Sequence, residues 1–232
     1  MDAKLRTLRF ETTGQRHAHH RTARDLTLLI GLTLALHIPF VAQAFHLDDV
    51  QYLDIAQNVY RNPLFPLDLP SVFEGRRLSL WAHSHPPLNS YVIAGLLLFH
   101  GRSPSEIFLH GAYLVFPVLV AVAFYFLARQ FVRHALLASA LLATNPTLMV
   151  CAHTLMADVP LLALWLCGAA LFIRGIDWDK NALVYAAALP ITAACFYAYQ
   201  AFAMIPLLSF YALKRRRITA RELLVLGVPL LL

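Results

Sequence analysis

Residues 135–173 read ALLASALLATNPTLMVCAHTLMADVPLLALWLCGAALFI. As one helix this apolar stretch would be about 58 Å long at ~1.5 Å per residue, roughly twice the ~30 Å of a bilayer's hydrocarbon layer. It is therefore predicted to form two spans. The break is expected between Asn145-Pro146 and Asp158-Val-Pro160, because an ionised aspartate at the bilayer centre costs roughly 2.5–3.5 kcal/mol. Asp158 is accordingly predicted at a turn near the membrane surface.

Similar apolar blocks occupy most of the chain on either side of this stretch. Hydrophobic residues make up 59% of the sequence and charged residues 14%, with a mean hydropathy of +0.60. A soluble domain has roughly 45–50% apolar and 25% charged residues. The sequence therefore predicts an all-α polytopic transmembrane helical bundle with about six to seven spans of ~20 residues each. The blocks are Leu26 to Phe45, Ile107 to Ala128, Ala135 to Ala152, Val159 to Ile173, Ala182 to Tyr199 and Ala201 to Leu213, with another beginning near Leu223.

The net charge of +6 is concentrated at the ends of these blocks, before the first and at residues 214–217 after the sixth. This placement indicates membrane orientation and gives no sign of a nucleic-acid partner, because short loops keep Lys and Arg on the cytoplasmic side. We expect residues 1–25 to form a basic cytoplasmic tail and residues 26–232 to form the transmembrane domain.

Two segments decide the rest of the topology. The first block has about 20 residues, against the usual 7–15 of a signal-peptide core, so an uncleaved anchor is favoured over a cleaved signal peptide. The apolar segment Pro87 to Phe99 is short for a crossing of ~20 residues, and an interfacial or re-entrant helix suits it better. The first outer loop then spans about residues 46–105, with Asp158 on the same side and Arg129 on the cytoplasmic side.

Two adjacent carboxylates, Asp48 and Asp49, follow the first block and precede a stretch predicted to be a short helix on the membrane surface. In one interpretation Asp48 caps that helix by accepting hydrogen bonds from its first free amides. In the other, partial desolvation at the membrane face tunes one carboxylate as a general base. The apolar face of this helix is predicted to comprise Val50, Leu53, Ile55 and Val59.

Two histidines, His83 and His85, precede the double proline at residues 86 and 87 of the same loop. They are candidates to bind a phosphate group or a metal ion, with simple interfacial histidines as the alternative. Metal sites normally need three or more protein ligands, and Asp158 is a candidate third group with helix capping as its rival role. A divalent ion at His85 is the only cofactor that the sequence suggests.

The order of these features resembles the polytopic GT-C glycosyltransferases. The shared features are an acid pair after the first span, an aromatic-rich surface helix, Pro-Pro-Leu at residues 86–88, a basic turn near Arg129, and later Asn-Pro and Asp-Val-Pro sequences. More narrowly, the chain is similar to the polyprenyl-phosphate-sugar-dependent branch, which includes protein O-mannosyltransferases and lipid A aminoarabinose transferases. The resemblance runs from about Leu26 to Leu213 and rests on order and spacing.

This resemblance implies a multi-pass glycosyltransferase of a bacterial inner membrane, acting in the cell envelope. It would move a sugar from a polyprenyl-phosphate donor to a lipid, glycan or protein hydroxyl. Asp48 matches the family's catalytic base and Asp49 its second acid. Substrate-binding candidates are Tyr52, His83, His85 and Asp158, and candidates to stabilise the departing phosphate are His83, His85, Arg76 and Arg77.

The chain departs from the family pattern in two respects. Relatives often carry a lysine, expected near the lipid phosphate, in the turn between the fifth and sixth spans, where this chain has Tyr197 to Gln200. Relatives also tend to have more spans and often a C-terminal soluble domain. The sequence ends at Leu232 inside an apolar run, so we expect it to be the N-terminal part of a longer protein.

Two other classes of function remain open. A transporter or permease fragment would use Asp158 and the loop histidines to relay protons or bind a solute. An inactive membrane piece is the third interpretation. Transporters tend to place polar groups at mid-span, whereas the acids here lie just outside the first span and at one turn. That placement favours the enzyme.

Overall fold

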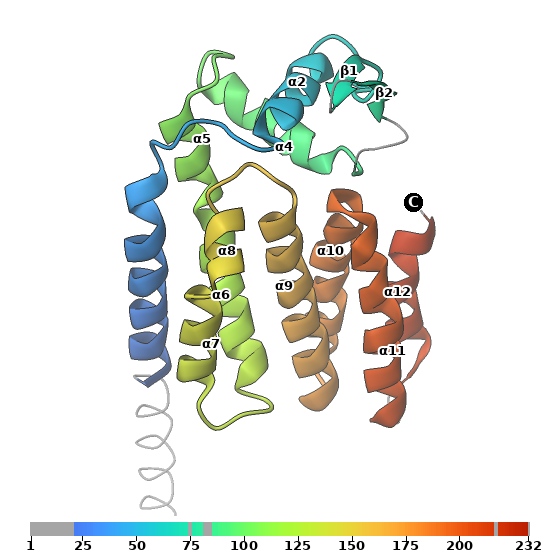
Figure 1. Ribbon diagram of the computed structural model, residues 1–232. Helices are drawn as coiled ribbons and strands as arrows, with labels where there is room; N and C mark the ends of the chain where they lie inside the picture. Colours follow the sequence, from blue (N-terminus) through green and yellow to red (C-terminus); the bar gives the residue numbers. More distant parts are fainter. Residues whose placement is uncertain (1–20, 74–75, 81–84, 216–217, 232) are drawn as a thin grey trace, which may run out of the picture.

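The computed structural model describes residues 21–73, 76–80, 85–215 and 218–231. Figure 1 shows a bundle of helices running side by side, with a layer of short elements across one end. We call this layer the cap. It contains α2 (Asp49–Val59), α4 (Leu88–Phe99) and a two-stranded antiparallel hairpin of β1 (Pro70–Phe73) and β2 (Arg76–Ser79).

Three helices in the described part of the chain are long and apolar enough to cross a membrane. They are Arg21–Phe40, which ends in the short 3-10 helix η1 (Ile38–Phe40), Glu106–Ala128, and α9 (Asp158–Asp177). The second of these comprises α5 (Glu106–Tyr113) and α6 (Val115–Ala128). The helical bundle is confirmed, whereas the predicted count of six to seven spans is not, because the remaining bundle helices are shorter.

The long apolar stretch that decided the fold is broken where the sequence predicts. It forms α7 (Ala135–Ala143), α8 (Pro146–Cys151) and then α9. The side chain of Asn145 starts α8 by accepting hydrogen bonds from the backbone amides of Thr147 and Leu148 at 3.0 and 3.3 Å. Asp158 is the first residue of α9, at the end of a turn, as predicted.

The closest packing in the bundle lies between α9 and α10 (Asn181–Tyr197). A Cβ atom added at Gly168 would lie 2.8 Å from Ile191 Cγ1, and one added at Gly175 would lie 2.8 Å from the backbone nitrogen of Val184. Small residues thus allow the two backbones to approach closely, as in many membrane helix pairs. The chain continues through η2 (Tyr199–Ala203), α11 (Met204–Lys214) and α12 (Ala220–Leu231).

The cap packs on the bundle through one apolar cluster. Tyr52 and Leu53 of α2 pack with Ile93 and Leu97 of α4 and with Leu109 of α5. The short helix predicted at Pro87 to Phe99 is confirmed as α4, which has 12 residues and lies in the cap (Figure 1).

The predicted apolar face of α2 is wrong at one position. Val50 is 54% exposed, whereas the neighbouring Asp49 is completely buried. Residues three, four and seven positions apart share one side of a helix, so Asp49 lies on the same face as Tyr52, Leu53 and Ala56. The hydrophobicity of Val50 alone did not reveal this, because the burial of Asp49 depends on polar partners elsewhere in the chain.

Candidate functional site

The two adjacent acids occupy different environments. Leu47 adopts a left-handed backbone conformation, with φ of 52°, and the chain then begins α2. Asp48 stands at the N-cap position of α2, but its side chain accepts no capping hydrogen bond. No hydrogen bond or ion pair joins its partly exposed carboxylate to any described residue. Asp48 therefore occupies the N-cap position, as the capping interpretation predicts, but its side chain does not cap the helix, so that part of the interpretation is wrong.

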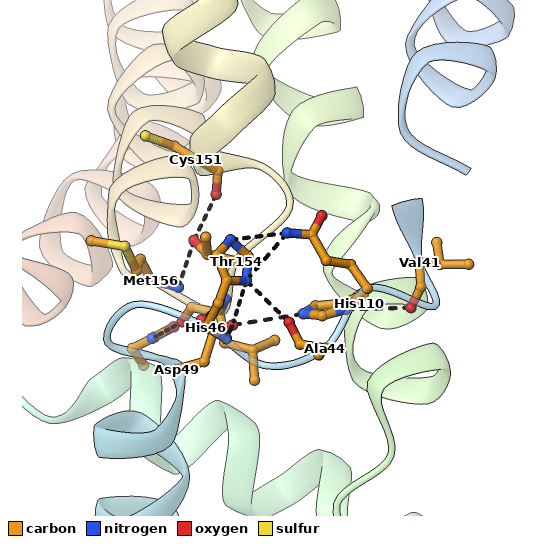
Figure 2. Close-up of polar contacts among 11 residues, drawn as sticks. Val41, Ala44, His46, Asp49, His110, Cys151, Thr154 and Met156 are labelled. Carbon is orange, nitrogen blue, oxygen red and sulfur yellow. Dashed lines mark hydrogen bonds and ion pairs between the residues drawn. The ribbon is translucent and has the colours of Figure 1, made fainter. Parts of the chain in front are cut away.

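Asp49 is 0% exposed and makes several polar contacts. Its Oδ1 accepts a hydrogen bond from the backbone amide of Leu155 at 2.7 Å, and its Oδ2 accepts one from the amide of His46 at 3.1 Å. The ring nitrogens His46 Nδ1 and His110 Nε2 lie 3.6 and 3.9 Å from Oδ2. Figure 2 shows His46, Asp49 and His110 side by side, with Thr154 approaching from the turn before α9.

Buried side chains hold the backbone of Leu155 at both its N–H and its carbonyl. Asp49 binds its N–H, while the Asn89 Nδ2 of α4 donates a hydrogen bond to its carbonyl at 2.7 Å. The Tyr113 hydroxyl of α5 in turn donates to Asn89 Oδ1 at 2.8 Å. We call these three side chains, together with the Leu155 peptide, the peptide clasp. Because Leu155 lies three residues before Asp158, the clasp fixes the turn that carries Asp158 to the cap.

The same turn has its own internal support. The Thr154 hydroxyl donates a hydrogen bond to the carbonyl of Cys151 at 2.8 Å and accepts one from the amide of Met156 at 3.2 Å (Figure 2). These bonds satisfy polar backbone groups at the end of α8, where the helix itself leaves carbonyls without partners. The turn is thus shaped locally and then anchored by the clasp.

The three predicted acids all act electrostatically on the phenol of Tyr52. Burial is the main cause that raises the pKa of its phenol well above the ordinary value, and a hydrogen bond with the Ala157 backbone opposes this. The negative charges of Asp158, Asp48 and Asp49 also raise the pKa of Tyr52, in that order of size. Acids from two separate loops therefore influence one buried phenol, and Asp158 itself is exposed.

Comparison with protein families shows the family of the chain. A model of the dolichyl-phosphate-mannose-protein mannosyltransferase family matches residues 84–232. The chain belongs to this family. It is thus a membrane glycosyltransferase of the GT-C type, as the resemblance in the sequence indicated. No curated protein and no solved structure matches the chain. The matched region includes Asn89, Asp158 and the Leu155 turn, whereas the two acids of α2 precede it.

Only some of the residues predicted to contact the donor phosphate lie in the described part of the chain. His83 lies outside the described residues. His85 precedes α4 and is partly buried, and it makes no hydrogen bond or ion pair with the described residues. Arg77 of β2 is exposed. At the position where relatives often carry lysine, Tyr197 is buried beside Phe116, with ring centroids 6.3 Å apart.

Sequence analysis missed a histidine cluster beside the acids. His37 Nδ1, at the end of the first span, lies 2.9 Å from His153 Nε2, in the turn before α9. Burial, followed by the nearby His110 and His46, lowers the pKa of His153. The available signal was that His37 and His110 interrupt apolar blocks, where an ionisable residue suggests a functional site. In the described part of the chain, no three His, Cys, Asp or Glu side chains form a metal-holding group.

Proposed function

We propose that this chain transfers a sugar from a polyprenyl-phosphate donor to a hydroxyl of a lipid, glycan or protein acceptor, with Asp48 as the general base. The difference between the two adjacent acids carries this proposal. Asp49 is buried and holds the Leu155 amide, so it serves the architecture of the site. The Asp48 carboxylate is partly exposed, has no hydrogen-bond partner among the described residues, and lies close enough to Tyr52 to affect its pKa.

The reaction needs one proton acceptor and stabilisation of one leaving group. The Asp48 carboxylate takes the proton of the acceptor hydroxyl, whose oxygen forms a bond to the anomeric carbon of the sugar. The bond from that carbon to the phosphate oxygen breaks, and the polyprenyl phosphate leaves with the electron pair. Candidates to stabilise its negative charge are His83, His85, Arg76 and Arg77, together with a divalent ion at His85.

Two neighbouring groups are proposed to bind the sugar. The Tyr52 phenol is protonated at neutral pH, as an ordinary tyrosine with a pKa of about 10 already is, and it can donate a hydrogen bond to a sugar oxygen. The exposed carboxylate of Asp158 can accept hydrogen bonds from sugar hydroxyls. The position of Asp158 depends on the peptide clasp, so Asp49 and Asn89 are positioning residues in this proposal.

We further propose the membrane arrangement that this chemistry needs. About six to seven apolar segments of residues 26–232 would cross a bacterial inner membrane, with the cap outside and the basic tail of residues 1–25 in the cytoplasm. The support is the charge distribution: Arg129 ends α6 and Arg215 ends α11, at the end of the bundle away from the cap. Short cytoplasmic loops favour such residues.

The test compares Asp48→Asn with Asp49→Asn in the full-length protein. Transfer of labelled sugar from polyprenyl-phosphate sugars is measured in membranes, and thermal unfolding is measured in detergent. Asp48→Asn should lower the transfer rate by roughly 10²–10⁴ with an unchanged unfolding temperature, because only the base is removed. Asp49→Asn should lower the unfolding temperature, because hydrogen bonds to a buried carboxylate contribute about 1.5–3 kcal/mol each.

Two outcomes would decide against this assignment. If Asp48→Asn transfers sugar at the wild-type rate while Asp49→Asn loses activity without losing stability, the base is Asp49. If neither substitution slows transfer in a folded protein, the proposed mechanism is wrong.

A further inference from the structure

An apolar groove runs along the bundle between α6, α9 and α10, towards the end away from the cap. It has a volume of about 380 Å³, and its wall includes Leu119, Val122, Cys167, Leu171 and Leu183. A second cavity of about 300 Å³ adjoins it and shares Phe126, Arg174 and Trp178 with it. We call these two adjoining cavities together the channel; it is apolar along the helices and polar where α9 ends.

Three cations line the polar end of this channel. Arg174 and Lys180 line the groove and Arg129 lines the adjoining cavity, and none of the three makes an ion pair with another residue in the described part of the chain. The Arg174 guanidinium lies over the Trp178 ring at 4.2 Å, and the Lys180 ammonium lies over the same ring at 5.7 Å. Arg129 donates a hydrogen bond to the Thr22 hydroxyl at 2.8 Å.

Two carboxylates at this end of the channel have interactions of their own. Asp177, which also lines the second cavity, pairs with Arg215 at 3.3 Å and accepts hydrogen bonds from the Tyr211 hydroxyl at 2.9 Å. Asp179 is engaged in an interaction of its own. The polar end of the channel therefore keeps an excess of positive charge beside an apolar wall.

We propose that this channel binds one anionic glycerophospholipid, with its phosphate between Arg174 and Lys180 and an acyl chain along the apolar wall. Trp178 marks the level of the interface, where tryptophan is enriched in membrane proteins. Basic pockets between membrane helices on the cytoplasmic side bind anionic headgroups. A soluble anion would leave the apolar wall uncovered, whereas a membrane lipid covers both parts of the channel.

This lipid site is separate from the sugar-transfer site: it rests on the proposed membrane orientation and not on the proposed reaction. Asp158 begins α9 and Trp178 follows its last residue, and α9 has 20 residues. At ~1.5 Å per residue, the two ends are about 30 Å apart along the helix axis. A donor lipid engaged by the acids at the cap would therefore lie at the opposite end of the bundle from this channel.

The experiment titrates the full-length protein in detergent micelles with phosphatidylglycerol or with phosphatidylcholine of identical acyl chains, and native mass spectrometry counts bound lipid. We expect tighter binding of phosphatidylglycerol. Since each basic residue near a membrane surface contributes about 1 kcal/mol, Arg174→Gln and Lys180→Gln should each weaken phosphatidylglycerol binding about fivefold. Val122→Trp, which fills the groove and keeps the cations, should weaken binding of both lipids.

Lys214→Gln is the matched control. It removes a cation from the same end of the bundle, where the Lys214 ammonium lies over the Phe210 ring at 5.4 Å and outside the channel. Its phosphatidylglycerol binding should equal that of the wild type, and thermal unfolding verifies that each variant is folded. Equal binding of the two lipids, unchanged binding in Arg174→Gln and Lys180→Gln, or an equal loss in Lys214→Gln would each overturn the proposal.

Discussion

The cap junction and the α9–α10 interface hold the molecule together in different ways. At the cap junction, buried polar side chains of α2 and α4 form hydrogen bonds with the N–H and the carbonyl of Leu155, and a side chain of α5 supports them. At the α9–α10 interface, Gly168 and Gly175 allow backbones to approach so closely that a methyl group would meet Ile191 or Val184. The cap junction is therefore held by individual hydrogen bonds, whereas the α9–α10 interface depends on the small size of its glycine residues.

This difference has a functional consequence. A buried hydrogen-bond network specifies one position for each member, because a displaced member leaves a costly unpaired group. The acids of the proposed site lie at the cap junction and need fixed positions, which buried hydrogen bonds provide. The α9–α10 interface carries no proposed catalytic group, and close packing of small residues is sufficient there.

The largest effect is expected from Asn89→Leu, which removes the middle member of the peptide clasp. The Leu155 carbonyl and the Tyr113 hydroxyl would both lose a buried partner. Each unsatisfied buried group costs about 1–3 kcal/mol, so the free energy of unfolding should fall by about 2–6 kcal/mol. Thermal unfolding of the purified protein in detergent measures this change.

Ser90→Ala provides the control for this prediction. Ser90 is the next residue of α4 and is also buried, but its hydroxyl makes no hydrogen bond with the described residues. Its removal should change the unfolding temperature little. Equal unfolding temperatures for the two variants would mean that the clasp does not hold the cap.

The sequence predicted most of the bundle because hydropathy and helix breakers are local signals. Asn145 and Pro146 end one helix and start the next, and Asp158 begins another, as expected from their chemistry. The number of spans was less predictable. Helices such as α10, with 17 residues, fall below the length of a clear crossing, and composition alone does not decide their role.

The site was predictable only in part, because its parts come from distant segments. Asp48 and Asp158 were found from their places at the ends of apolar blocks, and Tyr52 brings them together. Neither Asn89 nor His153 was marked as a site residue by its place relative to an apolar block. Their importance arises from contacts with residues more than 60 positions away, which no local pattern records.

An intermediate effect is expected from Gly175→Ala, which tests the α9–α10 interface. The added methyl group would lie 2.8 Å from the backbone nitrogen of Val184, a neighbour that cannot rotate away. Overpacking of this kind typically costs about 1–3 kcal/mol, so thermal unfolding should occur at a lower temperature.

Gly111→Ala in α5 is the matched control, since nothing lies within 4 Å of its added Cβ. Alanine is favoured over glycine within a helix by up to about 1 kcal/mol, so this variant should be as stable as the wild type or slightly more so. If both alanine variants were stabilised alike, the close approach of α9 and α10 would not exist in the folded protein.

The smallest effect is expected from His153, and it depends on pH. His153 stacks on Phe40 with ring centroids 4.3 Å apart, and burial is the main cause that lowers its pKa in the folded protein. As pH falls below the ordinary histidine pKa of about 6.5, the unfolded chain binds a proton before the folded protein does. The free energy of unfolding should therefore fall as the pH is lowered from about 7.5 to 5.

His153→Gln keeps a polar group beside His37 but removes this titration, so its unfolding temperature should fall less steeply over the same pH range. His134→Gln is the control, because His134 is exposed at the end of the bundle away from the cap. Carboxylates that titrate at low pH contribute equally to all three proteins, so the difference in slope comes from His153 and its contact with His37. Parallel slopes for wild type and His153→Gln would show that His153 is as easily protonated in the folded protein as in the unfolded chain.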